Sequence, residues 1–180
     1  MFFKESKKFL TQDNIDFIEN TILGNNFPFY RMPHTVKNNN QDTLTHIVLT
    51  RPEDNFSPRI RSPYYNPILN IIKSFLKSVN INNIKILRLA INFTYNNGHK
   101  KCTTHTDHCY DHSQLIIYLN DPLDKKSKTV ILDKNKKIIK EIYPEKYKGV
   151  LFEGFSHYLY YPKKGSRIIL IATFEYENNR

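Results

Sequence analysis

The chain has 180 residues, enough for one domain with a substantial buried core. Hydrophobic residues make up 39% of it and aromatic residues 13%, a composition that excludes intrinsic disorder as its overall state. A formal net charge of +10 favours an acidic partner, with nucleic acid the first candidate, although lysine-rich surfaces also serve solubility alone.

The cysteines and the N-terminus indicate where the protein works. Cys102 and Cys109 are too few for a disulfide scaffold. The first residues lack the apolar core of a signal peptide, and no run approaches the roughly 18 apolar residues of a membrane span. We therefore expect a cytoplasmic protein that does not contact a membrane.

Two helices are predicted in the first half of the chain. The first runs from about Gln12 to Leu23, with Thr11 as its N-terminal cap. The polar, asparagine-rich residues 31–45 predict a loop, and 46–50 a short strand. The second helix runs from about Pro67 to Val79, with Asn66 as its cap. It buries an apolar stripe of Ile68, Leu69, Ile72, Phe75 and Leu76.

A basic segment without acids separates Asp54 from Asp107. Its positive charges are Arg59, Arg61, Lys73, Lys77, Lys85, Arg88, Lys100 and Lys101. Aromatic residues such as Phe56, Tyr64 and Tyr65 lie beside the two arginines at its start. Arg59, Arg61 and Tyr64 are therefore our candidate substrate-binding residues, because such side chains contact backbone phosphates and stack on bases. The alternative is a chance cluster of solvated lysines.

From Ile84 the hydrophobic period changes to two, which predicts strands. Leu87, Leu89, Ile91 and Phe93 would pack on the helices, and the alternating set, with Arg88 and Asn92, would face a barrel interior. Further strands are expected at 114–120, 129–132, 138–142, 149–152, 157–161 and 167–176. The profile predicts a mainly β fold with helical support (α+β): a jelly roll, or double-stranded β-helix, preceded by two helices. We expect one domain over 1–180, with helical support in about 1–83 and the core in about 84–176.

The residues His105-Thr106-Asp107 carry the chemistry that we expect. On an extended strand, positions i and i+2 point to one face, about 6.5 to 7 Å apart. A His and an Asp placed in this way can bind one face of a metal ion. A second histidine, His157, would complete a facial triad of two His and one carboxylate, which leaves positions open on non-haem Fe(II).

The order of these features resembles the Fe(II)/2-oxoglutarate-dependent dioxygenases, in their prolyl-hydroxylase-like branch. The resemblance covers residues 84 to 176. Its features, in chain order, are a strand ending in Tyr95, His105-x-Asp107, Ile-Tyr118-Leu-Asn, the second histidine His157, and Gly-Ser-Arg167 before a final apolar strand. The small size and layout are also similar to phage- and virus-encoded members, which would place the protein in a host cytoplasm.

The resemblance implies a role for each matching residue. His105, Asp107 and His157 would bind the iron and form the catalytic centre. Arg167 would pair with the distal carboxylate of 2-oxoglutarate, because a guanidinium fork offers it two parallel hydrogen bonds. Tyr118 would help to hold this carboxylate. Tyr95 would lie near the metal-bound end of the cosubstrate, with Asn92 as the alternative at that position.

The turn between the strands of His157 and Arg167 decides whether both side chains point to the same face. If residues 162–165 form a four-residue hairpin loop between the strands of His157 and Arg167, these two side chains point to opposite faces. We therefore predict a loop of three or five residues, or a bulge, which would return them to one face. We expect His108 to face away from Asp107 towards solvent or substrate, and His34, His46 and His99 to be surface or loop residues.

The implied reaction is the hydroxylation of a C–H bond with O2 and release of succinate and CO2, with ascorbate as the reductant. The basic segment favours a nucleic-acid base as the substrate. A protein prolyl hydroxylase is the alternative, and the similarity at Tyr95 and Tyr118 supports it more directly. A further alternative is a jelly-roll module that binds a metal without catalysis.

Overall fold

The computed structural model describes residues 2–34, 41–55 and 57–177. Its strands are β1 (Phe3–Ser6), β2 (Tyr30–Met32), β3 (Thr43–Leu49), β4 (Ile84–Tyr95), β5 (Ser113–Tyr118), β6 (Thr129–Leu132), β7 (Ile138–Ile142), β8 (Gly149–Glu153), β9 (His157–Leu159) and β10 (Ser166–Tyr176). Its helices are α1 (Gln12–Phe17), continued by the π-helical turn η1 (Ile18–Ile22), the short α2 (Pro52–Asn55) and α3 (Tyr65–Ser78).

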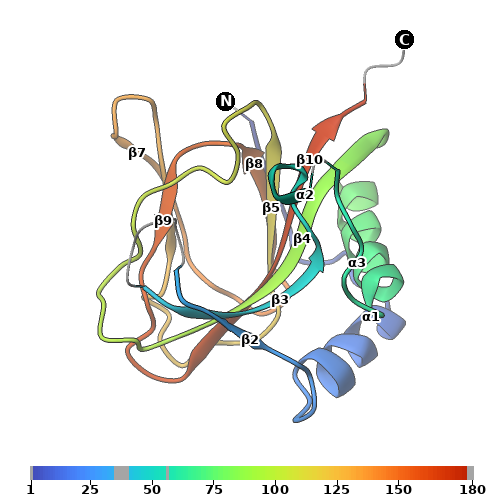
Figure 1. The fold of residues 1–180 in the computed structure, drawn as a ribbon, viewed down its shortest axis with the longest axis horizontal. Coiled ribbons are helices and arrows are strands. Elements are labelled where there is room, and N and C mark those ends of the chain that lie inside the picture. The colour runs from blue at the N-terminus through green and yellow to red at the C-terminus, as the bar shows by residue number, and fades with distance from the viewer. Residues whose placement is uncertain (1, 35–40, 56, 178–180) are drawn as a thin grey trace.

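The strands form two antiparallel sheets that face each other. The large sheet has the order β1-β8-β5-β10-β4-β3-β2, and the small sheet the order β7-β6-β9. In Figure 1, β7 and β9 lie on one side of the molecule and α1 and α3 on the other, with β4, β5 and β10 between them. The predicted jelly roll is confirmed.

Alternating residues of the large sheet supply two separate cores. Leu89, Ile91 and Leu170 point outward and pack against Ile72 of α3 and Ile22 of η1. On the inner face, Ile116, Tyr118, Phe152, Ile169 and Ile171 meet Ile131 and Ile142 of the small sheet. The period of two predicted for residues 84–94 is therefore real, and it assigns Arg88 and Asn92 to the space between the sheets.

Both predicted helices are present, with one correction. Thr11 caps α1 as expected, in a reciprocal arrangement with Asn14. The second helix begins at Tyr65 rather than at Pro67, so Asn66 is not its cap. The N-cap residue is Tyr64, which makes no side-chain cap hydrogen bond. Ser62 holds the turn before the helix, because its hydroxyl accepts the Tyr64 N–H and its carbonyl oxygen accepts the Tyr65 N–H. None of the helices in the described ranges is long and apolar enough to cross a membrane.

The first 83 residues contribute strands as well as helices. β1 pairs with β8 at one edge of the large sheet, and β3 pairs with β4 on the other side, followed by β2. The loop expected at 31–45 is interrupted by β2 and β3 at its two ends, and its residues 35–40 lie outside the described part of the chain. The helical support and the jelly-roll core are thus interleaved along the chain.

The expected hairpin between the last two strands does not form. β9 pairs with β6 in the small sheet, whereas β10 pairs with β4 and β5 in the large one. The chain therefore crosses from one sheet to the other between Leu159 and Ser166. Arg167 and His157 face the same interior because their sheets oppose each other, and no bulge is needed to bring them together.

Candidate metal centre

His105 and His157 are brought together by their backbones. The segment around His105 is a loop rather than the strand we expected, and it is joined to the start of β9 by a single bridge. The His105 N–H donates to the His157 carbonyl oxygen at 3.0 Å, and the His157 N–H donates to the His105 carbonyl oxygen at 2.8 Å. This pair places the two imidazole rings 4.6 Å apart, measured between ring centres.

Each imidazole is held by a hydrogen bond at its Nδ1, so that Nε2 keeps a lone pair when the ring is neutral. His105 Nδ1 lies 2.9 Å from the Thr103 carbonyl oxygen, and His157 Nδ1 lies 3.0 Å from that of Phe155. A carbonyl oxygen can only accept, so the proton is on Nδ1 in both rings. Burial, and then repulsion from His105, lowers the pKa of His157 to about 4. His157 is therefore neutral at pH 7, as a metal-binding histidine must be.

Asp107 has one oxygen occupied and one without a partner. Oδ1 accepts from Arg51 Nη2 at 2.9 Å and from Arg88 Nη1 at 3.0 Å. Oδ2 is buried and has no hydrogen-bond partner in the described part of the protein. Burial alone would raise the pKa of this carboxyl, but the nearby positive charges, that of Arg88 first, outweigh it and hold the pKa well below its usual range. Asp107 is therefore a carboxylate with one oxygen free to bind a cation.

The three side chains approach one another without forming a finished metal site. His157 Nε2 and Asp107 Oδ2 are 3.9 Å apart. Within the residues that the structure describes, no three His, Cys, Asp or Glu side chains are already gathered as a metal-binding group. On binding a cation, the side chains of His105, Asp107 and His157 would have to move closer to one another.

A narrow cavity of about 60 Å³ lies between the two sheets at this point. It is lined by Arg51, Arg88, Asn92, Cys102, His105, Asp107, Gln114, Ile116, Thr129, His157, Leu159, Arg167, Ile169 and Ile171. Five buried side-chain atoms in the described residues have no hydrogen-bond partner, and four of them belong to this lining: Asp107 Oδ2, Gln114 Oε1, and Nε and Nη1 of Arg167. Since such atoms cost about 1 to 3 kcal/mol each, their concentration in one place indicates a polar ligand.

Arg167 is the deepest charge of the cavity, with 0% of its surface exposed. Its Nη2 donates to Thr129 Oγ1 at 2.6 Å, across from the large sheet to the small one. The Tyr118 ring lies 5.2 Å from the guanidinium carbon, and the Tyr118 hydroxyl is 3.4 Å from the same Thr129 oxygen. Two N–H groups of Arg167 are thus left for a carboxylate. Tyr118 supports this guanidinium and is not itself among the residues that line the cavity.

Asn92 and Tyr95 are separated by the pleat of β4. Asn92 lines the cavity, and its Oδ1 accepts from the Thr45 hydroxyl at 3.1 Å. Tyr95 packs near Phe93, a residue of the outer core beside the helices, and it is absent from the described cavity lining. Of these two alternatives, the structure brings only Asn92 to the triad.

The candidate substrate-binding residues lie elsewhere. Arg59 and Arg61 are exposed on the segment that pairs with the end of β3, and Tyr64 packs against Phe17 and Phe27 over the helices. None of the three is among the described residues of the cavity. Phe56 lies outside the described part of the chain.

The acid-free basic segment is not one surface. Lys73 and Lys77 are exposed on α3, Lys85 pairs with Glu175, and Arg88 is half-buried and pairs with Asp107. Charges that are close in sequence are therefore distributed over several sides of the fold, and the segment as a whole forms no nucleic-acid groove.

Two histidine predictions were wrong. His108 is buried rather than facing solvent, with Nδ1 2.7 Å from Glu53 Oε1 and Nε2 2.7 Å from Thr173 Oγ1. His46 is also buried, between the Pro28 carbonyl oxygen and the Ser62 hydroxyl. His46 lies in the middle of β3 and His108 in the loop before β5, and other segments cover both residues. Sequence periodicity carries no signal for such long-range cover.

Sequence reasoning missed several residues of the cavity, among them Arg51, Gln114 and Cys102. Arg51 follows β3 and is hydrogen-bonded to Asp107, which lies 56 positions later in the sequence, so no local pattern predicts this contact. Gln114 was detectable, because it has the same strand parity as Tyr118 and a buried glutamine on an inward face is unusual. Cys102 is buried in the lining with its Sγ 3.2 Å from the Leu159 N–H, and burial raises the pKa of its thiol.

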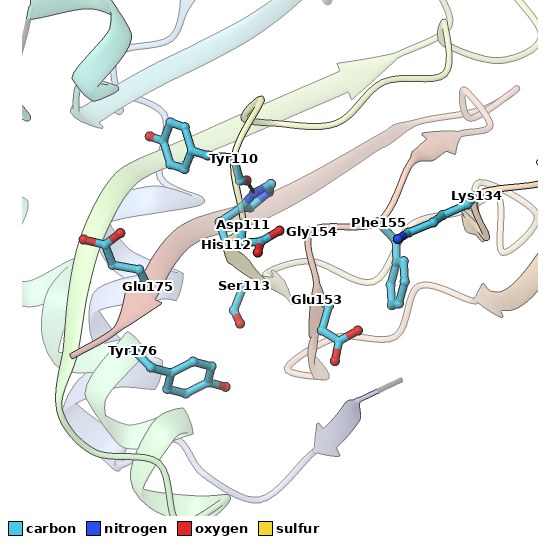
Figure 2. Close-up of a pocket in the computed structure, with 10 residues that line it drawn as sticks. All are labelled: Tyr110, Asp111, His112, Ser113, Lys134, Glu153, Gly154, Phe155, Glu175 and Tyr176. Carbon is cyan, nitrogen blue, oxygen red and sulfur yellow. Dashed lines mark hydrogen bonds between the residues drawn. The ribbon is translucent and has the colours of Figure 1, made fainter. Parts of the chain in front are cut away.

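Two larger hollows adjoin the barrel at this end. A groove of about 400 Å³ on β3 and β4 shares Arg51, Arg88 and Asn92 with the cavity. A second hollow, of about 610 Å³, lies at the ends of β5, β8 and β10, where Tyr110, Glu175 and Tyr176 face Glu153 and Lys134 (Figure 2). It shares no lining residue with the cavity, so of these two hollows only the groove adjoins the triad.

No family model matches the chain. No curated protein matches it either. Similarity appears only among solved structures, and at low sequence identity, so it shows the fold alone.

An oxidoreductase of the 2OG-Fe(II) oxygenase family from Burkholderia pseudomallei superposes with a TM-score of 0.74 at 12% identity, over 98% of this chain and 86% of that one. A viral collagen prolyl hydroxylase from Paramecium bursaria Chlorella virus-1, solved with 2OG, gives 0.58 at 16% identity, over 98% and 97%. A prolyl hydroxylase from Trichoplax adhaerens, in complex with a peptide fragment of hypoxia inducible factor, gives 0.66 at 12% identity, over 96% and 82%. The chain thus has the fold of these oxygenases over nearly its whole length.

Proposed function

We propose that the protein is an Fe(II)- and 2-oxoglutarate-dependent dioxygenase that hydroxylates a C–H bond and releases succinate and CO2. The supporting observation is the set of buried polar atoms without partners around one cavity: an acceptor on Asp107 beside two imidazole lone pairs, and two donors on Arg167. The donor set suits Fe(II) at one end and a carboxylate at the other.

Each residue has a separate task in this proposal. His105, Asp107 and His157 would hold the iron, and Arg167 would pair with the distal carboxylate of 2-oxoglutarate. When bound, the iron supplies the oxidising chemistry with O2 and 2-oxoglutarate, and ascorbate keeps it reduced. Arg51 and Arg88 orient Asp107 so that Oδ2 points inward, and the apolar residues of the lining exclude water. A five-carbon diacid exceeds about 60 Å³, so its binding requires the lining side chains to move apart.

For the substrate, we propose a prolyl residue of a peptide. The groove beside the cavity continues along the inner face of β3 to β2, which is the edge strand of the large sheet and therefore has backbone groups available for an extended chain. Prolyl hydroxylases are also among the proteins of similar fold. A nucleic-acid base is the second candidate and rests on the net charge of +10, since Arg59, Arg61 and Tyr64 are not among the residues that line the cavity.

The test is mass spectrometry of proline-containing peptides, DNA and RNA after incubation with the protein, Fe(II), 2-oxoglutarate and ascorbate. We expect peptides to gain one oxygen atom in step with succinate production. A gain on nucleic acid alone would replace the substrate and keep the reaction. Binding of Mn(II) without any 2-oxoglutarate-dependent succinate would support the metal-binding module instead, and binding of neither would end the proposal.

A further inference from the structure

A cleft of about 800 Å³ lies apart from the candidate metal centre. Its lining is Asn96, Gly98, His99, Lys100, Asp124, Lys126, Lys128, Tyr143, Tyr160, Tyr161, Pro162 and Lys163. No residue of this lining belongs to the cavity of the triad or to its groove. Four lysines and three tyrosines from separate parts of the sequence thus converge on one hollow, in contrast to the dispersed charges of residues 55–106.

Hydrogen bonds fix three of the loops that build this cleft, and Tyr143 contributes from the segment after β7. The Tyr161 N–H donates to the Lys100 carbonyl oxygen at 3.1 Å, which joins the loop after β4 to the one after β9. Asp124 joins the third loop, because its carboxylate accepts the backbone N–H groups of Lys126 at 2.9 Å and Lys163 at 2.8 Å. These bonds hold the pKa of Asp124 below its ordinary value. Asp124, the one acid of the lining, therefore already uses both carboxylate oxygens to hold the loops.

The lysines divide into one that is paired and three that are exposed. Lys128 is 2.7 Å from Glu141 and lies over the rings of Tyr143 and Tyr160, at 5.2 and 5.6 Å from their centroids. Lys100, Lys126 and Lys163 are exposed. Since their backbones are tied together, three ammonium groups are kept in one region despite their mutual repulsion. This arrangement favours a ligand that carries several negative charges.

The cleft also offers exposed aromatic surface to such a ligand. Tyr143 is 49% exposed, and Lys128 connects it with the half-buried Tyr160. Exposed tyrosine faces beside lysines form the combination that binds unpaired bases and their phosphates. Bases in a duplex are stacked on one another and do not offer their faces in this way.

We propose that this cleft binds single-stranded nucleic acid, with Lys100, Lys126 and Lys163 on the phosphates and Tyr143 under a base. The site is separate from the catalytic cavity and does not depend on the proposed dioxygenase reaction. It would attach the protein to a nucleic acid while the groove beside the triad remains open.

The experiment is fluorescence anisotropy with a labelled oligothymidylate and the full chain, without Fe(II) or 2-oxoglutarate. We expect the triple variant K100Q/K126Q/K163Q to bind at least tenfold more weakly. The slope of log affinity against log salt should fall by about 2, since each neutralised phosphate of a single strand contributes about 0.7. The matched control is K8Q/K73Q/K77Q, which removes the same charge from exposed positions outside the cleft. Thermal unfolding of both variants verifies that they fold.

A second pair of variants tests the aromatic contact. Tyr143→Ala should weaken binding by about tenfold, as expected for one stacked base. Tyr176→Ala removes a similarly exposed ring, 46% exposed, from the hollow at the end of β10 and should have no effect. Equal losses in the lysine control, equal affinity for duplex, or displacement of the oligonucleotide by inorganic phosphate alone would each overturn the proposal, as would the absence of binding.

Discussion

The cavity of the triad and the lysine cleft use positive charge in opposite ways. In the cavity, Arg167 is buried and the Arg88 side chain is only 14% exposed, and each has a fixed geometry set by a partner on another strand or loop. Burial and the nearby Arg51 lower the pKa of Arg88 to about 10, so it stays charged at neutral pH. In the cleft, Lys100, Lys126 and Lys163 remain hydrated.

The difference predicts how each region tolerates change. A buried charge without its partner leaves a desolvated group uncompensated, so a single substitution in the cavity affects stability and function together. Exposed lysines contribute in small and additive steps, and their loss affects affinity and its salt dependence while stability stays constant.

The largest effect should follow from Asp107→Asn. The amide keeps the shape of the side chain, but it provides no charge for Arg51 and Arg88 and a poorer ligand for a cation. We expect Mn(II) affinity, measured by titration calorimetry, to fall by more than about 100-fold, with loss of succinate production. The unfolding free energy should fall by about 3 kcal/mol, as for other broken buried pairs. Unchanged Mn(II) binding would remove Asp107 from the site.

Arg167→Met should raise the stability of the protein and weaken its binding of 2-oxoglutarate. Methionine fills a similar volume and removes two buried N–H groups that lack partners in the described structure. In the absence of 2-oxoglutarate we therefore expect an unfolding free energy higher by about 1 to 3 kcal/mol. The affinity for 2-oxoglutarate should fall at least tenfold, whereas Mn(II) affinity should stay within about twofold, because the metal ligands are untouched. A variant that is less stable and still binds the diacid would contradict the role of Arg167.

Arg51→Gln should have a smaller effect than the loss of either cavity residue above. The side chain is 33% exposed, and Asp107 keeps its bond to Arg88. We expect Mn(II) affinity to fall about tenfold, as is usual for a group that orients a ligand, with little change in stability. The conservative variant Arg51→Lys, which can still reach the carboxylate as a point charge, should recover part of the loss. Equal affinity in all three proteins would show that Arg88 alone orients Asp107.

The smallest effects should distinguish Asn92 from Tyr95. Asn92→Ala removes a polar group from the cavity lining and should raise the KM for 2-oxoglutarate by a few-fold, about the value of one neutral hydrogen bond. Tyr95→Phe alters a ring on the other side of β4 and should leave KM and kcat within experimental error. The opposite ranking would return the cosubstrate role to Tyr95.

Much of the site was already visible in the order of residues along the chain. The two helices, most of the strands and the alternation in β4 follow from hydrophobic period, which is a local property. His105, Asp107, His157 and Arg167 were named by their resemblance to an ordered set of motifs, and the structure places all four around one cavity. The same resemblance left Tyr95 and Asn92 as alternatives, and only Asn92 is among the residues that line the cavity.

The sequence by itself determined the type of fold, because hydrophobic period is a property of single segments. The metal-binding candidates and Arg167 came from the resemblance to an ordered set of motifs along residues 84–176. Tertiary structure decided which strand pairs with which, and so turned an expected hairpin into a crossing between sheets. It also decided that Arg51 and Arg88 share Asp107, and that the lysines gathered at one cleft come from three loops. Contacts between residues far apart in the chain follow from how sheets and loops pack, and no local pattern of sequence encodes them.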